Sequence, residues 1–241
     1  MQAAKEFHRF ASTYGHYNVI QRQAAEYLVS WIGETAVGTV VDLGCGDGEV
    51  FRQLQKRRLA YKHFVAVDLA DSMLALHPQT DKVHCMKSDF NDEISLRQLS
   101  VYDPDLLISS SALQWSDDLD RTFTHLSQLA SSVYFSIFTD GTFATLHRQA
   151  GLKSPIRSFE ETKDALLRFY YVRRMERVSY RLYFNSRQEI FRYIKRSGVS
   201  GGKARLGYRA IRRLMEEYPL DYLEFELLFA SLVPRSSFSR S

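Results

Sequence analysis

Cysteine, proline and long apolar runs are all scarce in this chain of 241 residues, which has two cysteines and five prolines. Cys45 and Cys85 are too few for the disulfide framework of a small secreted protein. No apolar run approaches the roughly eighteen residues that a membrane-spanning helix needs, and the first residues lack the apolar core of a signal peptide. The seven histidines form no HxxxH pair and the cysteines form no CxxC pair, so we predict no metal site. These absences predict a soluble, cytoplasmic protein that does not bind a membrane.

Negative and positive charges nearly balance, but they are unevenly distributed. The formal net charge is +4, yet the C-terminal third is rich in arginine. Its basic residues are Arg168, Arg173, Arg174, Arg177, Arg181, Arg187, Arg192, Lys195, Arg196, Lys203, Arg205, Arg209, Arg212 and Arg213. Such an asymmetry indicates an anionic partner, which can be a nucleic acid, a membrane surface or an acidic protein. The alternative is an ordinary solvated helix face.

Residues 40–48, VVDLGCGDG, are the most informative stretch of the sequence. An apolar run breaks into a glycine-rich turn, and a helix is predicted to start at Glu49 directly after it. Glycine suits such a turn because it tolerates positive φ and lets the backbone approach a ligand. A second apolar run, 63–67, then ends in Asp68. This strand–helix–strand pattern predicts that Asp68 binds the two hydroxyls of a ribose.

The spacing of the glycines differs from the GxGxxG pattern of dinucleotide-binding enzymes. It is D-x-G-x-G-x-G, with Asp42 in the predicted strand and Asp47 in the turn. Two carboxylates beside the turn would repel a pyrophosphate, whereas they would attract a cofactor whose amino-acid portion is cationic. At this point the sequence resembles the class I S-adenosylmethionine-dependent methyltransferases. The resemblance implies S-adenosyl-L-methionine as the cofactor.

The resemblance also implies which residues hold each part of that cofactor. The glycine turn is expected to hold the methionyl part, Asp68 the ribose and Asp89 the adenine amino group. An aromatic segment ahead of the core, from Phe10 to Gln21, is similar to one that lies over the cofactor in small-molecule methyltransferases. The expected cofactor-binding residues are Tyr14, Gln21, Asp42, Gly44, Cys45, Gly46, Asp68, Leu69, Met73, Asp89, Phe90, Ser109 and Ser110. For Tyr14 and Gln21 the alternative is an amphipathic helix that packs on the sheet.

The resemblance implies a single α/β domain, residues 1–241, built on the Rossmann-like, seven-stranded sheet of the class I methyltransferases. An N-terminal helical segment precedes the core, and a helical cap is inserted before the last strands. The expected segments are N-terminal helices at 1–35, a cofactor-binding core at 36–140, a cap or substrate arm at 141–180, C-terminal helices and strands at 181–232, and a flexible tail at 233–241. The expected strands are 40–43, 63–68, 82–86, 103–109, 133–138, 181–184 and 225–232.

A second informative stretch, Ser109 to Trp115, follows the fourth predicted strand. Ligands of open α/β sheets bind beyond the carboxyl ends of the strands, so this loop is expected to face the transferred methyl group. Its S-x-A-L-Q-W sequence and the turn from Gly141 to His147 resemble the malonyl-acyl-carrier-protein O-methyltransferases of biotin synthesis and relatives such as trans-aconitate methyltransferases. Thr145 stands where that family has an acidic residue. Tyr14, Gln114 and Trp115 are the candidates for positioning the reacting groups.

The resemblance implies methyl transfer to the free carboxylate of a malonyl thioester on acyl carrier protein. That carboxylate is ionised at neutral pH, so the reaction needs alignment and exclusion of water rather than a general base. The expected substrate residues are Arg148, as the first candidate to hold the carboxylate, His147 beside it, and Arg157 and Arg173 as rivals. Acyl carrier proteins are acidic, and we expect one to dock on a basic surface formed by Arg205, Arg209, Arg212 and Arg213.

Other functions fit parts of the same sequence. The basic C-terminal third also suits an RNA or protein methyltransferase, but the sequence has no separate RNA-binding domain, no Asn-Pro-Pro-Tyr loop and no pair of catalytic cysteines. A small free acid such as trans-aconitate is an alternative acceptor. A non-catalytic assembly factor that keeps the methyltransferase fold is a further alternative. We expect a monomer without a nucleic-acid partner.

Overall fold

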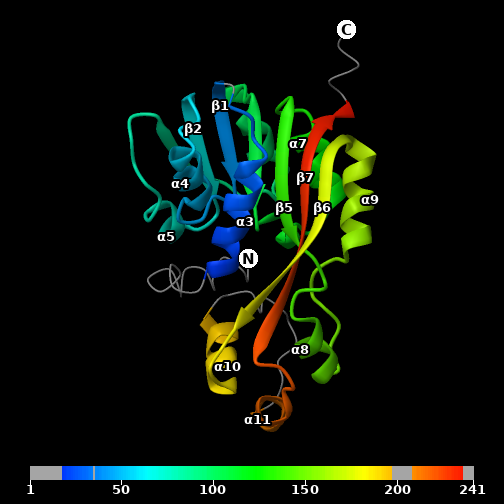
Figure 1. Ribbon diagram of the computed structural model, residues 1–241. Helices are drawn as coiled ribbons and strands as arrows, with labels where there is room; N and C mark the ends of the chain where they lie inside the picture. The colour runs from blue at the N-terminus through cyan, green and yellow to red at the C-terminus, as the bar shows by residue number, and fades with distance from the viewer. Residues whose placement is uncertain (1–17, 35, 197–207, 236–241) are drawn as a thin grey trace.

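The computed structural model describes residues 18–34, 36–196 and 208–235. Its centre is a seven-stranded sheet with the order β3-β2-β1-β4-β5-β7-β6 (Figure 1). The strands are β1 Val37–Leu43, β2 Tyr61–Asp68, β3 Val83–Lys87, β4 Leu106–Ser110, β5 Ser132–Phe138, β6 Tyr170–Tyr183 and β7 Tyr222–Pro234. The first five strands are parallel, whereas β7 is antiparallel to both β5 and β6. This arrangement confirms the predicted α/β fold with seven strands.

Helices connect the strands and cover both faces of the sheet. They are α3 Val19–Ser30, α4 Glu49–Lys56, α5 Asp71–Leu74, α6 Glu93–Gln98, α7 Leu119–Leu126, α8 Ala144–Gln149, α9 Phe159–Phe169, α10 Arg187–Arg196 and α11 Tyr208–Glu217, with 3-10 turns at η2 Leu99–Tyr102 and η3 Leu113–Trp115. The predicted helix starts at Asn18 and Glu49 agree with α3 and α4. Among the described residues, no helix is long and apolar enough to cross a membrane.

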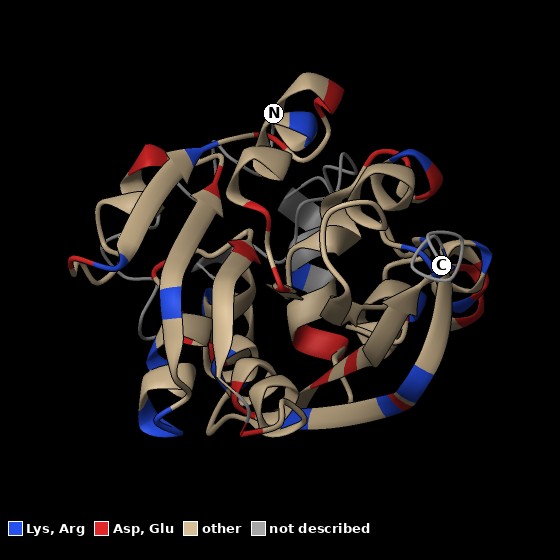
Figure 2. Ribbon diagram, turned by 90° about the horizontal axis from the view of Figure 1, so that it is seen from above, with Lys and Arg blue, Asp and Glu red and all other residues tan. Residues whose placement is uncertain are grey.

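The central strands are buried on both sides, as the continuous apolar runs predicted. Along β1, Val40 belongs to one hydrophobic cluster and Val41 to the other, because successive side chains of a strand point to opposite faces. Figure 2 shows that most charged residues lie on the outside of the molecule and that the strands in the middle of the sheet carry few of them. Helix α3 packs on one face against α4, and α7 and α9 pack together on the other. The buried faces of these elements form the core.

The strands β6 and β7 form a hairpin that extends below the rest of the sheet in Figure 1 and has α10 and α11 at its lower end. The strand expected at 181–184 is therefore only the end of β6, which begins at Tyr170. The second half of the expected arm at 141–180 contains α9, which packs on β6 and β7, and most of β6 itself. The expected tail overlaps with β7, which runs to Pro234.

The arginines along β6 make this long strand difficult to recognise in the sequence. β6 is the edge strand of the sheet, so its outward side chains are exposed and carry charge. Arg174 pairs with Glu176, Arg177 pairs with Glu160, and the guanidinium of Arg181 lies 5.0 Å from the ring centre of Tyr222. Several of the arginines that make the C-terminal third basic thus protect a sheet edge. The last part of the segment expected to be an arm, from Tyr170, is therefore a strand of the sheet.

The side chain of Phe229 joins α3 to the hairpin. It is fully buried and its ring lies 5.1 Å from that of Tyr27 and 6.0 Å from that of Trp31. We expect Phe229→Ala to lower the free energy of unfolding by about 3–5 kcal/mol, because it removes this contact and leaves a cavity. Urea denaturation measures the change. Val101→Ala is the control, since Val101 is 82% exposed and its truncation should cost less than about 0.5 kcal/mol. Equal effects of the two substitutions would contradict the packing described.

Candidate active site

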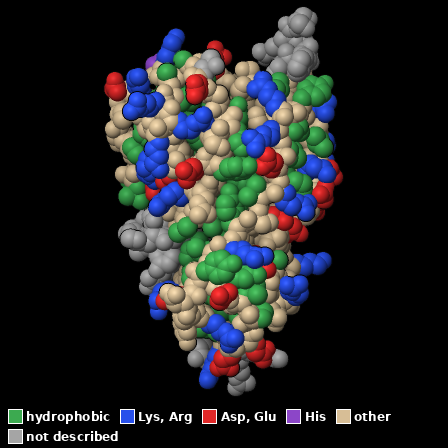
Figure 3. Space-filling view, in the orientation of Figure 1, with side chains coloured by type: hydrophobic (Ala, Val, Ile, Leu, Met, Phe, Trp, Pro, Cys, Tyr) green, Lys and Arg blue, Asp and Glu red, His purple; other side chains and the backbone are tan. Residues whose placement is uncertain are grey.

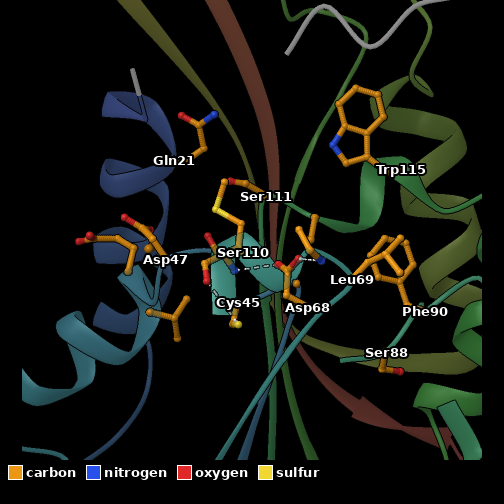
Figure 4. Close-up of a pocket in the computed structure, with 18 of the residues that line it drawn as sticks. Gln21, Cys45, Asp47, Asp68, Leu69, Ser88, Phe90, Ser110, Ser111 and Trp115 are labelled. Carbon is orange, nitrogen blue, oxygen red and sulfur yellow. Dashed lines mark hydrogen bonds between the residues drawn. The ribbon is translucent and has the colours of Figure 1, made fainter. Parts of the chain in front are cut away.

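A pocket lies beyond the carboxyl ends of β1, β2, β3 and β4, where open α/β sheets bind ligands. Its lining residues are Asn18, Gln21, Ala25, Gly44, Cys45, Gly46, Asp47, Glu49, Val50, Asp68, Leu69, Ala70, Met73, Ser88, Asp89, Phe90, Asn91, Ser110, Ser111, Ala112, Trp115 and Asp117. Figure 4 shows Gln21, which comes from α3, and Trp115 on opposite sides of the pocket, with Cys45 and Asp68 between them. The lining is thus assembled from loops that are far apart in the sequence.

The glycine turn adopts the conformation that its residues predicted. Gly44 has φ +75°, and a Cβ on it would lie 2.3 Å from the Cβ of Ala112, so only glycine fits there. Gly46 also has a positive φ, +54°, but a Cβ on it would meet no atom within 4 Å. Gly46 lines the pocket. Gly44 therefore brings the β1 and β4 loops together, whereas the absence of a side chain on Gly46 leaves space for a ligand.

Asp68 fixes this turn to the end of β2. One carboxylate oxygen accepts a hydrogen bond from the backbone N–H of Gly46 at 2.9 Å, and the other accepts one from Ala70 at 2.8 Å. Asp89 plays a similar part after β3, because its carboxylate accepts the backbone N–H of Asn91 at 2.8 Å. Each ionised carboxylate has about four acceptor positions, so one carboxylate can accept several hydrogen bonds at once. Both carboxylates are thereby held in fixed positions in the pocket wall.

The wall of the pocket is acidic. It contains the carboxylates of Asp47, Glu49, Asp68, Asp89 and Asp117, and among the described residues no lysine, arginine or histidine lines it. Arg52 stands outside the lining and pairs with Asp47 at 3.0 Å and with Glu49 at 3.1 Å. The guanidinium holds these two side chains but does not enter the pocket. The pocket therefore favours a ligand that carries positive charge.

Several polar atoms of the lining have no hydrogen-bond partner among the described residues. They are the side-chain oxygens of Gln21, Ser88 and Ser111. Ser111 also has φ +61°, which is unusual for a residue with a side chain and occurs mainly at functional sites. Buried polar groups are normally satisfied by protein, water or ligand. A polar ligand that reaches this wall would supply the missing partners.

Most of the expected cofactor residues meet in this pocket. Those that line it are Gln21, Gly44, Cys45, Gly46, Asp68, Leu69, Met73, Asp89, Phe90 and Ser110, together with Trp115. Asp42 and Ser109 do not, since both are fully buried within the sheet. The hydroxyl of Ser109 donates to the backbone oxygen of Leu43 at 2.6 Å. Tyr14 lies outside the described residues.

Gln114 is also absent from the lining. It is buried, and its amide donates to the backbone oxygen of Ser111 at 2.6 Å. The side chain therefore supports the loop after β4 from within, and its expected contact with the reacting groups is corrected. The sequence motif found the right loop, but the geometry of the 3-10 turn decides which of its side chains reach the pocket.

The expected substrate residues do not gather at one place. Arg148 is exposed on α8 and donates to the hydroxyl of Thr145 at 3.0 Å. His147 is half-buried, and this burial lowers the pKa of its imidazole. Arg157 donates to the backbone oxygens of Ser116 and Asp117. None of the three lines the pocket.

Arg173 lies at the wrong end of the sheet for a role at this site. Its guanidinium is 3.4 Å from the hydroxyl of Ser132, the first residue of β5. The pocket lies beyond the other end of the parallel strands. Because β6 runs antiparallel to β7 from this edge, the sequence position of Arg173 gave no hint of its distance from the site. Its expected substrate role is therefore corrected.

Three of the four expected docking arginines belong to α11. Arg205 is outside the described residues, whereas Arg209, Arg212 and Arg213 belong to the helix. Arg212 is exposed and pairs with Glu216 at 2.9 Å. On the face shown in Figure 3, lysine and arginine side chains are spread widely and mixed with acidic ones.

Several lining residues were not expected from the sequence, namely Asn18, Glu49, Ser88, Asn91, Ser111 and Asp117. Asn91 could have been found from its place, two residues after Asp89 in the loop that follows β3. Ser111 follows β4 in the same way. Asn18 comes from the start of α3, and its approach to the glycine turn depends on how that helix packs.

Comparison with known proteins shows similarity to methyltransferases in both sequence and fold. A family model described as a methyltransferase domain matches residues 41–132. The fold is similar to a chain in the complex between the Haloferax volcanii Trm112 methyltransferase activator and the putative methyltransferase, with a TM-score of 0.63, 15% identity, and coverage of 95% of this chain and 98% of that one. It is also similar to a putative methyltransferase from an antibiotic biosynthesis pathway of Anabaena variabilis, with a TM-score of 0.59, 11% identity, and coverage of 86% and 96%. The chain therefore has the fold of the class I S-adenosylmethionine-dependent methyltransferases, as the sequence predicted, and residues 41–132 match a methyltransferase domain.

Within this class, the chain is similar to proteins named malonyl-[acyl-carrier protein] O-methyltransferase. The protein of Bacillus cereus is 32% identical over 174 residues, which cover 69% of this chain and 63% of the relative. The protein of Chlorobium phaeovibrioides is 25% identical over 234 residues, which cover 90% and 87%. The chain spans 63% of the Bacillus cereus relative and 53% of the Priestia megaterium relative, less than two thirds of either.

Asp42, which is buried beneath the pocket wall in β1, should make the free energy of unfolding depend on pH. Its carboxyl is fully buried without a hydrogen-bond partner among the described residues. Burial raises its pKa well above the usual value of 3.8, and the negative charge of Asp68 raises it further. The folded carboxyl therefore keeps its proton at pH values where the unfolded one is ionised. Between those two pKa values the free energy of unfolding falls as pH rises, by about 1.4 kcal/mol per pH unit.

The substitution Asp42→Asn removes this group from the titration. We expect the variant to gain stability relative to the parent as the pH rises above about 4, until the folded pKa of Asp42 is passed. Urea denaturation of both proteins at a series of pH values measures the difference. A difference that stays constant with pH would show that Asp42 has the same pKa in the folded and unfolded states.

Proposed function

We propose that this protein binds S-adenosyl-L-methionine in the pocket and transfers its methyl group to the carboxylate of a malonyl group carried on acyl carrier protein. The observation that carries the cofactor assignment is the acidic pocket at the carboxyl ends of the strands, which has no basic residue among its described lining. The names of the relatives support the acceptor. The product would be the methyl ester that starts biotin synthesis.

The residues present fit this cofactor. The turn at Gly44 and Gly46 leaves space for its methionyl part, and carboxylates of the wall suit its cationic groups. Asp68, whose carboxylate is held at the end of β2 by two backbone contacts, would accept hydrogen bonds from the ribose hydroxyls. Asp89 would accept one from the adenine amino group. Gln21, whose side-chain oxygen has no partner among the described residues, lies across the pocket from Trp115 in Figure 4 and would contact the methionyl part.

The lining also fits the proposed reaction. When bound, S-adenosyl-L-methionine would supply an electrophilic methyl group: a carboxylate oxygen can bond to that methyl carbon in line as its bond to the sulfonium sulfur breaks, and the sulfur leaves as the neutral thioether of S-adenosylhomocysteine. The acceptor is already ionised near neutral pH, so no group of the protein has to remove a proton. No histidine or lysine is found in the described lining, which agrees with such chemistry. Phe90 and Trp115 provide apolar surface that can exclude water from the reacting groups.

The acceptor carboxylate needs a cation, because the acidic wall would repel it. We propose Arg148 for this role. Its guanidinium contacts the hydroxyl of Thr145, which in turn donates to Glu224 at 2.7 Å. Thr145 stands where the family that the sequence resembles has an acidic residue. Here Glu224 of β7 supplies a carboxylate to this turn instead. Arg148 stays on α8, below the carboxyl end of β5 in Figure 1.

The carrier protein would approach the arginines of α11. Arg209, Arg212 and Arg213 belong to this helix, at the far end of the β6–β7 hairpin. An acidic protein would be attracted to such a surface mainly through its rate of association. A small free acid such as trans-aconitate would use the same pocket and no docking surface, and a non-catalytic assembly factor would bind the cofactor without methyl transfer.

The first experiment is methyl transfer from labelled S-adenosyl-L-methionine to malonyl-acyl carrier protein, compared with free malonate, malonyl-CoA and trans-aconitate. We expect label on the carrier that is lost on mild ester hydrolysis. Label only on a free acid would contradict the carrier assignment. Cofactor binding without any transfer would favour the assembly factor or another macromolecular acceptor.

A matched pair of glycine substitutions tests the cofactor site. Gly46→Ala should weaken cofactor binding by about tenfold or more, or about 1.4 kcal/mol, because the methyl enters the space proposed for the ligand. Gly151→Ala is the control, since Gly151 also has a positive φ and also has no atom within 4 Å of an added Cβ, but lies outside the pocket. Calorimetric titration measures both affinities. Equal affinities would place the cofactor elsewhere.

Two arginine substitutions test separately the binding of the malonyl carboxylate and the docking of the carrier protein. Arg148→Ala should raise KM for every malonyl substrate by about tenfold to hundredfold, since it removes the proposed partner of the carboxylate. Arg212→Glu should raise KM only for malonyl-acyl carrier protein and leave malonyl-CoA unchanged. Steady-state kinetics with both substrates measures the split. An Arg148→Ala enzyme with unchanged KM, or an Arg212→Glu enzyme that is impaired with both substrates, would refute the corresponding role.

A further inference from the structure

The segment from Trp115 to Asp117 is held by two side chains from distant parts of the chain. It follows β4, and both Trp115 and Asp117 line the pocket. We infer that Arg157 and Asn91 are positioning residues, which act through this segment to set the place of the Trp115 indole at the acceptor side of the pocket. The inference rests on the proposed methyl transfer, but the position of Trp115 can be measured without it.

Arg157 holds the segment from outside the pocket. Its guanidinium donates to the backbone oxygen of Ser116 at 2.9 Å and to that of Asp117 at 3.0 Å. These residues are separated from Arg157 by 41 and 40 positions in the chain. The planar guanidinium can bridge two neighbouring carbonyl groups, which a single ammonium group cannot do with the same geometry. The contact therefore fixes the direction of the segment as well as its position.

The backbone of Arg157 is itself anchored. Its carbonyl oxygen accepts a hydrogen bond from the backbone N–H of Asp140, directly beyond β5, at 3.0 Å. The guanidinium lies in a groove whose lining includes the carboxylates of Asp120, Glu161 and Asp164. These negative charges stabilise a cation at this place. Arg157 thus connects the end of β5 to the segment after β4, and its charge is engaged away from the pocket.

Asn91 holds the same segment from the pocket side. Its side-chain oxygen accepts the backbone N–H of Asp117 at 2.8 Å, and its amide nitrogen lies 3.4 Å from the backbone oxygen of Trp115. The backbone N–H of Asn91 donates to Asp89, the residue proposed to hold the adenine. A continuous set of contacts therefore runs from the proposed adenine end of the pocket to Trp115. Figure 4 shows Trp115 and Phe90 on the same side of the pocket.

Four side-chain contacts to three consecutive backbone units leave this segment little freedom. The indole that it carries is partly exposed and forms part of the wall. In-line methyl transfer depends on alignment, and a misplacement of about 1 Å can reduce a rate by about a hundredfold. Loss of the Arg157 contact should therefore reduce kcat more than it changes the affinity for the cofactor, because Arg157 does not touch the pocket.

Fluorescence of Trp115 provides a direct readout. The sequence has two tryptophans, and the other, Trp31 at the end of α3, packs against Tyr27 of α3 and Phe229 of β7. A Trp31→Phe parent therefore has Trp115 as its only tryptophan. In this parent, Arg157→Ala should shift the emission to longer wavelength and increase quenching by acrylamide, without any ligand present. It should also lower kcat by about tenfold to a hundredfold and leave the Kd for S-adenosyl-L-methionine within about twofold.

Arg168→Ala is the matched control. Arg168 lies in the same groove but pairs with the side chain of Asp120, so its removal takes away the same charge without touching the segment. We expect its Trp115 emission and kcat to equal those of the parent. Arg157→Lys should restore the charge but only part of kcat, because it replaces a bridge by a single ammonium group.

The outcomes separate this inference from the proposed function. Unchanged emission and unchanged kcat in Arg157→Ala would overturn the positioning role, even in an active parent. A parent that binds no S-adenosyl-L-methionine would overturn the proposed function, while the emission shift would still test the contact. Equal shifts in Arg157→Ala and Arg168→Ala would show that the charge of the groove, and not the bridge to the segment, sets the position of Trp115.

Discussion

The hydrogen bond from the backbone of Gly46 to the carboxylate of Asp68 is the contact on which the rest of the site depends. It joins the turn after β1 to the end of β2, and the second oxygen of Asp68 extends this connection to Ala70 at the start of α5. The close approach of Gly44 to Ala112 adds the loop after β4. Three neighbouring strand ends are thus fixed to one another before any ligand is considered. The pocket is a consequence of this arrangement.

The distribution of charge around the pocket follows a simple division. Carboxylates form part of its wall, whereas the nearby guanidinium groups of Arg52 and Arg157 stand behind it and hold side chains or backbone in place. Each cation therefore stabilises the shape of the site without neutralising the face that a ligand meets. This division suits a cationic cofactor. It also explains why an anionic acceptor would have to find its partner on the hairpin side, where α8 lies.

The sheet also supports the part of the molecule that contains α10 and α11, at the lower end in Figure 1. The hairpin of β6 and β7 begins as the edge of the sheet and ends next to α10 and α11. Its buried residues, such as Phe229, fix it to α3, while its arginines pair with acidic or aromatic neighbours and protect the exposed edge. The same strand therefore determines where the segments that follow it lie relative to the pocket.

Local chemistry determined part of this protein from the sequence alone. The glycine turn and the central parallel strands were predictable, because positive φ favours glycine and buried parallel strands are continuously apolar. Asp68 and Asp89 were predictable because they follow such strands. Only the tertiary structure decided that Asp42 and Ser109 are buried within the sheet, that β6 begins at Tyr170, and that Arg157 turns toward Ser116 and Asp117. These outcomes depend on strand position and on contacts between residues some forty positions apart, which no local pattern records.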